Sequence, residues 1–187
     1  MNEQLIRQIQ NYTPFNEQEA TDKALILQLL ASNRDLSLRS CLDAHLTASA
    51  WVVSPDRQQV LMAYHNLYDS WAWLGGHADG DWNLMSVARR EAEEESGIRN
   101  LKTVTEDIFS LEILTVSGHE KRGHYVPSHL HLNLTYLFEG DPTLPLKIKD
   151  DENSAVGWIT VAEIAEKSTE PWFVERIYSK LVRKSAL

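Results

Sequence analysis

The sequence is poor in cysteine and has no long apolar run. Its one cysteine, Cys41, excludes an intrachain disulfide and fits a reducing compartment. No apolar stretch approaches the roughly 20 residues of a membrane-spanning helix, and the first residues lack the basic-then-apolar pattern of a secretory signal. We therefore expect a cytoplasmic protein without a membrane partner.

Basic residues are also scarce relative to acidic ones. The 187 residues include 18 Lys and Arg against 27 Asp and Glu, for a formal net charge of -9. This balance argues against a nucleic-acid backbone as the main partner. It is compatible with a small phosphorylated substrate, because bound divalent ions can invert the local field. The length predicts one domain with an appended segment.

The first 43 residues are predicted to be helical. A short helix near residues 3–11 is broken at Thr13 and Pro14, and a second helix begins at Asn16, with Glu19 three residues later as in a capping box, and runs to about Ala31. We expect this extension either to cover the main body of the fold or to contact a second subunit, as in a homodimer. Residues 44–187 would form the catalytic domain.

From residue 44 the pattern changes to that of strands. Residues 45–53 and 59–64 predict two strands joined by a turn with Pro55 at its second position, and further strands are predicted at 108–115, 129–138 and 156–159. Helices are predicted at 161–167 and from Pro171 to about residue 182. Residues 117–128 predict a loop containing Lys121 and Arg122, which is either a solvated tip or a basic arm that meets substrate phosphate.

The most specific stretch is a glycine-rich loop that follows residues 71–74 and leads into a helix. On a helical wheel the apolar positions at the start of this helix share one arc with three later carboxylates, whereas Ser86, Arg89 and Glu93 point away. The shared arc holds Leu84, Val87, Ala88, Glu91, Glu94 and Glu95. Gly97 is placed to end the helix as a left-handed cap.

Three inward carboxylates need a compensating charge. Close together and away from water they would repel one another, and their pKa values would rise unless a cation were bound. Oxygen ligands of this kind suit Mg²⁺ or Mn²⁺. The alternative is a solvated acidic face, but it would require the apolar stripe to stop halfway along the helix.

The run from Gly76 to Ile98 resembles the Nudix box. That pattern is Gly, five residues, Glu, seven residues, Arg-Glu, an aliphatic residue, any residue, Glu-Glu, any residue, Gly and an aliphatic residue. The residues at the expected spacing are Gly76, Arg90, Glu91, Ala92, Glu94, Glu95, Gly97 and Ile98. One position departs: Trp82 stands where the first glutamate belongs and can neither bind a metal nor pair with an arginine, although Asp79 and Asp81 lie close by.

The resemblance implies an α/β (α+β) fold, an α/β/α sandwich around a mixed β-sheet, here with the N-terminal helices added. It also implies hydrolysis of a nucleoside diphosphate linked to another moiety, by attack of water on phosphorus with Mg²⁺ or Mn²⁺. Glu94 and Glu95 would be direct metal ligands, and Glu91 a further ligand or an orienting group. Arg90, near Glu94, would hold a carboxylate, and Gly76 would let the backbone approach the site.

Other candidates are less closely tied to the motif. In some family members the general base is a glutamate six residues before a tryptophan, the relation of Glu152 to Trp158, although an ordinary surface position is equally compatible with Glu152. The candidate substrate-binding residues are His77, Arg122 and Tyr125, together with Gly76. Candidates for stacking on a nucleobase are Trp51, Trp71, Trp73 and Tyr125, most of which we expect in the core.

Two histidines stand two residues apart on a predicted strand. His129 and His131 share a strand face by spacing, which permits metal binding. No third ligand stands at a zinc-like spacing to support it.

Two other functions compete with hydrolysis. Isopentenyl diphosphate isomerases are Nudix relatives with a similar Gly-His loop, but they need a cysteine where this chain has Gly75, and Cys41 is far off in sequence. A nucleotide-sensing or regulatory module is the second alternative, because Trp82 replaces a motif glutamate. Retention of Arg90 and the three glutamates argues against it, since a pure binding module has no need of a costly carboxylate cluster.

Overall fold

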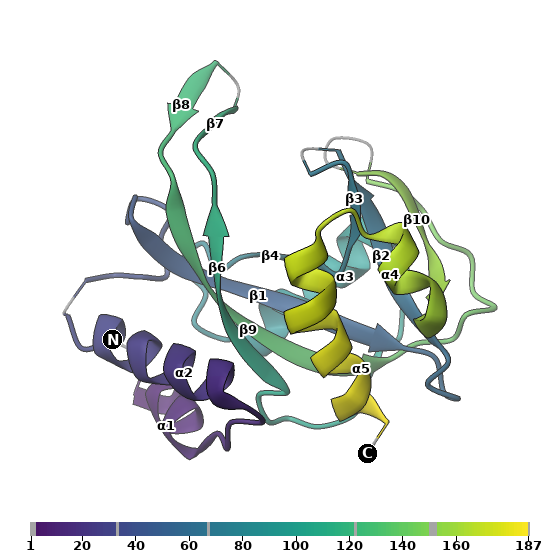
Figure 1. Cartoon of the computed structure of the whole chain (residues 1–187), viewed down its shortest axis with the longest axis horizontal. Helices are drawn as coiled ribbons and strands as arrows, with labels where there is room; N and C mark the ends of the chain where they lie inside the picture. Colours follow the sequence, from purple (N-terminus) through teal and green to yellow (C-terminus); the bar gives the residue numbers. More distant parts are fainter. Residues whose placement is uncertain (1–2, 33, 67, 122, 150–152, 187) are drawn as a thin grey trace.

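The fold is a mixed β-sheet with helices on both faces (Figure 1). The computed structural model describes residues 3–32, 34–66, 68–121, 123–149 and 153–186. The helices are α1 (Glu3–Asn11), α2 (Glu17–Leu30), α3 (Leu84–Ser96), η1 (Val161–Glu163), α4 (Ile164–Lys167), the π-helical η2 (Phe173–Tyr178) and α5 (Ser179–Ser185). The strands are β1 (Ala44–Val53), β2 (Gln59–His65), β3 (Ser70–Ala72), β4 (Leu74–His77), β5 (Lys102–Thr103), β6 (Ser110–Val116), β7 (His119–Lys121), β8 (His124–Val126), β9 (His129–Glu139) and β10 (Asn153–Thr160).

The sheet is organised around two parallel strands. β1 and β9 pair in parallel from Ala44 opposite Leu130 to Val53 opposite Glu139. On the other side of β1, β4 pairs antiparallel with residues 47–50 and β2 with the last residue, Val53, while β6 and β5 pair antiparallel with β9. β10 and β3 extend the sheet from β2. The predicted mixed sheet is confirmed.

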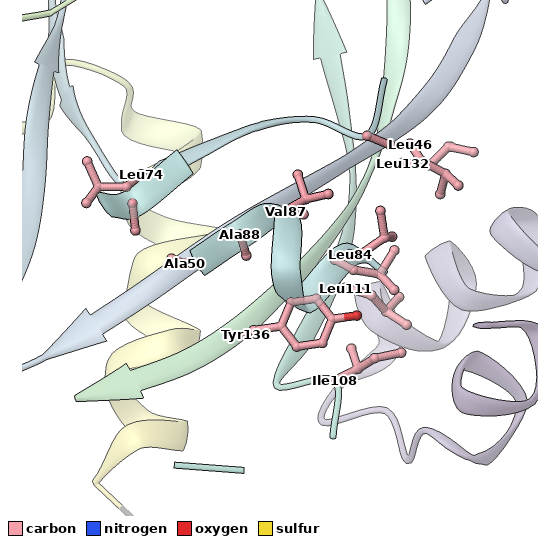
Figure 2. Packing of buried hydrophobic residues seen from close by; sticks show 14 of the residues in the cluster. Leu46, Ala50, Leu74, Leu84, Val87, Ala88, Ile108, Leu111, Leu132 and Tyr136 are labelled. Carbon is pink, nitrogen blue, oxygen red and sulfur yellow. The ribbon is translucent and has the colours of Figure 1, made fainter. Parts of the chain in front are cut away.

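The two faces of the sheet bury different helices, because successive strand residues point to opposite sides. Even-numbered β1 residues such as Leu46 and Ala50 pack in one cluster with Leu84 and Val87 of α3 (Figure 2). Odd-numbered Trp51 and Val53 join a second cluster with Ile177, Tyr178 and Leu181 of the C-terminal helix. Helices therefore cover both faces, and the predicted α/β/α sandwich is confirmed.

The N-terminal helices cover the edge of the sheet at β6. The side chain of Asn16 caps α2 by accepting the Glu19 backbone N–H at 2.9 Å, as predicted. The Asp22 carboxylate accepts the backbone N–H of Ile113 at 3.1 Å, which satisfies a donor on the edge strand. Leu5, Ile9, Ile26 and Leu30 are buried in the same cluster as α3. Contact with a second subunit stays a prediction.

A buried ion cluster joins α2 to the C-terminal helix. Lys180 is fully buried, and its Nζ lies 2.8 Å from Glu112 Oε1 on β6 and 3.1 Å from Glu19 Oε1 on α2. Lys184 Nζ approaches the same Glu19 oxygen at 3.2 Å. Removing one partner of such a cluster leaves an uncompensated buried charge. The cluster therefore fixes the extension to the main body.

Two segments differ from the sequence-based expectations. Residues 117–128 were expected as a loop, but they contain the hairpin β7–β8, which extends beyond the main sheet from the ends of β6 and β9 (Figure 1). In this hairpin the backbone N–H and C=O groups of β7 and β8 pair with each other, whereas in an open loop they would be hydrogen-bonded to water. The C-terminal helix is interrupted by the π-helical η2. None of the helices in the described part of the chain has the length and apolar character to cross a membrane.

Candidate active site

Gly76, the first glycine of the motif, and the preceding Gly75 lie in strand β4, close to neighbouring atoms. A Cβ built on Gly75 would lie 2.5 Å from the Ala48 carbonyl oxygen, and one on Gly76 would lie 2.6 Å from the carboxyl carbon of Glu91. Contacts that short do not occur, so glycine at position 75 lets β4 lie close to the backbone of β1, and glycine at position 76 leaves room for the Glu91 carboxylate. The backbone of β4 therefore lies beside the Glu91 carboxylate, and the predicted role of Gly76 in the site stays a prediction.

Helix α3 has the boundaries and orientation that its sequence predicts. Asn83 caps its start by accepting the Ser86 N–H at 3.2 Å, and Gly97 ends it with φ of 69°, the predicted left-handed cap. Leu84, Val87 and Ala88 are buried against the sheet. Arg89 points away from the carboxylates, as the helical wheel predicts, and its guanidinium lies 4.8 Å from the centre of the Phe138 ring.

The three carboxylates are buried to different degrees. Glu95 is 6% exposed and accepts the Gly75 backbone N–H at 3.2 Å. The side chain of Glu91 is 17% exposed, and burial, followed by the charge of Glu94, raises the pKa of Glu91 above its ordinary value. Glu94 is half exposed, with Lys149 Nζ 3.8 Å from its Oε2. A divalent cation would offset the repulsion that raises the Glu91 pKa, so the donor set fits one.

Arg90 connects two carboxylates beside this cluster. Its Nη2 lies 3.5 Å from Glu91 Oε1 and its Nη1 lies 3.6 Å from Asp81 Oδ2. Asp81 thus supplies a carboxylate for the arginine where the motif glutamate is missing. Trp82 is partly buried and packs against the apolar cluster under α3.

The family model described as the NUDIX domain matches residues 43–181. The chain belongs to the Nudix family. With the motif carboxylates in place on α3, it is a Nudix-type pyrophosphohydrolase acting on a small molecule. No curated protein matches the sequence.

Several solved structures share the Nudix fold with this chain. A C. elegans Ap4A hydrolase in a binary complex has a TM-score of 0.54 and 17% identity, over 75% of this chain and 94% of that one. RenU, a Nudix hydrolase from M. smegmatis, has a TM-score of 0.54 and 17% identity, over 76% and 86%. The MutT protein from Methanosarcina mazei Go1 has a TM-score of 0.52 and 17% identity, over 78% and 97%. At this identity the likeness shows the fold.

The remaining predicted residues are scattered relative to the Nudix helix. Tyr125 lies on β8, is 72% exposed, and sits on the hairpin that extends away from α3 (Figure 1). Trp51 is fully buried in the core, and Trp71 and Trp73 are partly buried against the same cluster. Arg122 and Glu152 lie outside the described residues, so their predicted roles stay predictions.

His77 lies in a group of histidines on the sheet face opposite the Nudix helix. The group also contains His45, His129 and His131, and ring centres of neighbouring members are 4.8 to 5.2 Å apart. Burial, followed by the other three rings, lowers the pKa of His131 to about 2, so that its ring is neutral. Sequence spacing exposed only the pair on β9, because the other two histidines come from β1 and β4 and meet that pair only through strand pairing.

An open groove of about 510 Å³ lies between the end of β6 and the start of the C-terminal helix. Its lining includes Tyr68, His119, Glu170, Trp172 and Phe173. The Phe173 ring meets the Trp73 ring edge to face, with centres 6.4 Å apart, and Trp73 is two residues before Gly75. One residue of the groove lining, Phe173, therefore contacts the residue that directly precedes β4. Sequence reasoning missed Tyr68 and Trp172, because isolated aromatic residues at element ends have no periodic signal.

Proposed function

We propose that this Nudix protein hydrolyses the diphosphate bond of a nucleoside diphosphate linked to another moiety, by attack of water on phosphorus, and that it depends on Mg²⁺ or Mn²⁺. The observation that carries the proposal is the acidic end of α3. There Glu91 lies against Gly76 and Glu95 accepts the N–H of Gly75, so that two carboxylates meet the backbone of one strand. A solvated acidic face would not bury Glu95 or press Glu91 against a glycine.

Glu91, Glu94 and Glu95 would hold the cation. All three offer oxygen, which suits Mg²⁺ and Mn²⁺ better than softer ions. When bound, the cation neutralises charge on the diphosphate and lowers the pKa of water near phosphorus. Arg90 orients Glu91 through the 3.5 Å contact and is itself held by Asp81.

The groove supports a substrate with an aromatic part. Trp172 is 48% exposed, and with Phe173 and Tyr68 it gives this surface aromatic side chains on which a nucleobase can stack. Glu170 in the same groove has its pKa raised by burial, so it is a candidate hydrogen-bond partner for the base. We propose that the nucleoside lies here while the diphosphate extends toward Gly75.

A general base completes the proposal. Glu152, six residues before Trp158, keeps its predicted role of activating the attacking water. Glu152→Gln should lower kcat with little change in KM, because a general base acts on the attacking water in the chemical step. Equal activity of this variant and the wild type would remove Glu152 from the mechanism.

The test is product release from a panel of nucleoside diphosphate derivatives with Mg²⁺ or Mn²⁺. The panel contains nucleotide sugars, ADP-ribose, dinucleoside polyphosphates such as the ligand class named for the C. elegans neighbour, and oxidised nucleotides. We expect turnover of at least one class, its loss in a Glu94→Gln, Glu95→Gln variant, and its retention in Glu106→Gln, which changes an exposed glutamate outside the site.

Two results would contradict the proposal. If no substrate turns over above the Glu94→Gln, Glu95→Gln control, the chain is not a hydrolase of this panel, and nucleotide binding without turnover would then favour the regulatory module. If turnover is the same with and without divalent cations, the cofactor assignment is wrong.

A further inference from the structure

Three histidines from three strands converge on one face of the sheet. His45 on β1 stands opposite His131 on β9 in the parallel register, and His77 on β4 pairs with Thr47, two residues along β1. Because alternate strand residues share a face, all three side chains point to the same side. One ring nitrogen of each lies within 4.8 Å of the corresponding nitrogens of the other two.

The buried ring of His45 is oriented toward this group and unsatisfied. Its Nδ1 lies 3.1 Å from the Cys41 carbonyl oxygen, to which it donates, so its Nε2 carries the lone pair. His45 is only 4% exposed, and Nε2 has no hydrogen-bond partner among the described residues. A buried acceptor without a partner destabilises a fold, so native structures rarely leave one. A cation at the centre of the group would give this nitrogen its partner.

The orientation of His45 is the one that metal-binding histidines adopt. Such a histidine almost always donates its other ring N–H to a backbone carbonyl or a carboxylate, which fixes the ring and leaves the second nitrogen for the metal. His129 has the same arrangement: its Nδ1 lies 2.8 Å from the Pro127 carbonyl oxygen, and its Nε2 lies 3.2 Å from Nε2 of His131. A hydrogen-bonded histidine cluster without a metal would leave the Nε2 of His45 unused.

We propose that His45, His77 and His131 form a binding site for a transition-metal ion of the Zn²⁺ class, separate from the carboxylate site. Zn–N bonds of about 2.0–2.1 Å in a tetrahedral site place ligand nitrogens roughly 3.4 Å apart. The nitrogens, which lie up to 4.8 Å apart, therefore need to approach one another by up to about 1.4 Å, which is within the reach of imidazole rotation about its side-chain torsions. His129 lies beside the ligands and holds the ring of His131.

The chemistry of the donors separates this site from the one on α3. Three neutral imidazoles favour Zn²⁺ and its neighbours, whereas three carboxylates favour Mg²⁺ or Mn²⁺. The two sites lie on opposite sides of β4, because Gly76 faces Glu91 while His77 faces the histidines. With three ligands from β1, β4 and β9, the ion would hold β4 in place and keep a fourth position open for water or a phosphate oxygen.

The experiment measures Zn²⁺ binding directly. Protein freed of its purification tag and stripped of metal is titrated with Zn²⁺ in excess Mg²⁺, by calorimetry and by elemental analysis after dialysis. We expect one bound Zn²⁺ per chain and a rise in the unfolding temperature. Substitution with Co²⁺ should give the visible absorption of a low-coordinate nitrogen site.

Matched variants assign the ion to its ligands. His77→Asn, at a half-buried position, and His131→Asn should each weaken Zn²⁺ binding by more than about 100-fold, the most that is lost when a residue that only orients a ligand is removed. His124→Asn, on the exposed hairpin, should bind as the wild type does. The Glu91→Gln, Glu94→Gln, Glu95→Gln variant should keep Zn²⁺ binding while losing hydrolysis, so this inference and the proposed hydrolase fail separately.

Circular dichroism shows which histidine variants keep the fold, and only those are compared. The inference is overturned if wild-type protein binds no Zn²⁺ in excess Mg²⁺. It is also overturned if the folded His77→Asn variant binds Zn²⁺ as tightly as the wild type, or if the triple glutamine variant loses it.

Discussion

Replacing Gly76 by alanine should disable the site without unfolding the protein. The new Cβ would lie 2.6 Å from Cδ and 2.8 Å from Oε2 of Glu91. An ordinary carbon contact is about 3.5 Å or longer, so the carboxylate has to move by about 1 Å. The strand cannot move instead, because Gly76 pairs with Ala48 in the sheet. The end of the glutamate side chain is flexible, so the displacement falls on Glu91.

A 1 Å displacement at a reacting site can cost on the order of 100-fold in rate, or roughly 2.7 kcal/mol of transition-state stabilisation. The assay is kcat/KM on the best panel substrate, together with thermal unfolding. The matched control is Gly157→Ala, whose Cβ would lie 3.7 Å from Trp71, an ordinary contact. Wild-type kcat/KM in Gly76→Ala would refute the argument that Glu91 needs this position.

Three further predictions concern the ion pairs. Lys180→Ala should lower the free energy of unfolding, measured in urea, by about 3–5 kcal/mol, because it leaves Glu19 and Glu112 buried without their cation. A loss below about 1 kcal/mol would contradict this and show that water reaches the cluster. Burial raises the pKa of Glu19, but Lys180 and its other partners lower it further, so the net pKa lies below the ordinary 4.5. The stabilisation that ionised Glu19 contributes is present above pH 4.5 and is lost as the pH falls through the lower pKa of the folded state. Glu19→Gln should therefore weaken the dependence of the unfolding free energy on pH in the acid range. An unchanged slope of unfolding free energy against pH would contradict this. Asp81→Asn should lower kcat/KM by less than about tenfold, since a half-exposed ion pair contributes at most about 1 kcal/mol. Arg90→Ala should lower kcat/KM further, because it also removes the contact with Glu91. A larger loss in Asp81→Asn than in Arg90→Ala would contradict the role given to Arg90.

Sequence patterns predicted the parts of this molecule that depend on local periodicity. The inward stripe of α3, its left-handed cap at Gly97 and the cap at Asn16 all follow from side-chain spacing and backbone chirality. The α/β/α sandwich, the Nudix family and the pyrophosphohydrolase class came from the motif, and the comparisons confirm them. The domain boundary after residue 43, the homodimer, the cytoplasmic location and the individual site roles stay predictions.

Features that depend on contacts between distant segments were not predictable in the same way. Lys180 occupies a helix position next to apolar residues, and its partners on α2 and β6 are far away in the chain, so no local pattern marks it as buried. His45 and His77 meet His131 only through the parallel register of β1 with β9 and the pairing of β4. The pairing of Asp81 with Arg90 depends on a loop conformation that sequence spacing alone does not fix.

The measurement that tests the central claim most directly is turnover in ¹⁸O-labelled water with Mg²⁺ or Mn²⁺, followed by mass spectrometry of the products. The account predicts one solvent oxygen on a phosphorus-containing product from at least one nucleoside diphosphate derivative, and none from the Glu94→Gln, Glu95→Gln variant. Products without solvent oxygen on phosphorus, or equal labelling by that variant, would contradict hydrolysis by the carboxylate site of α3.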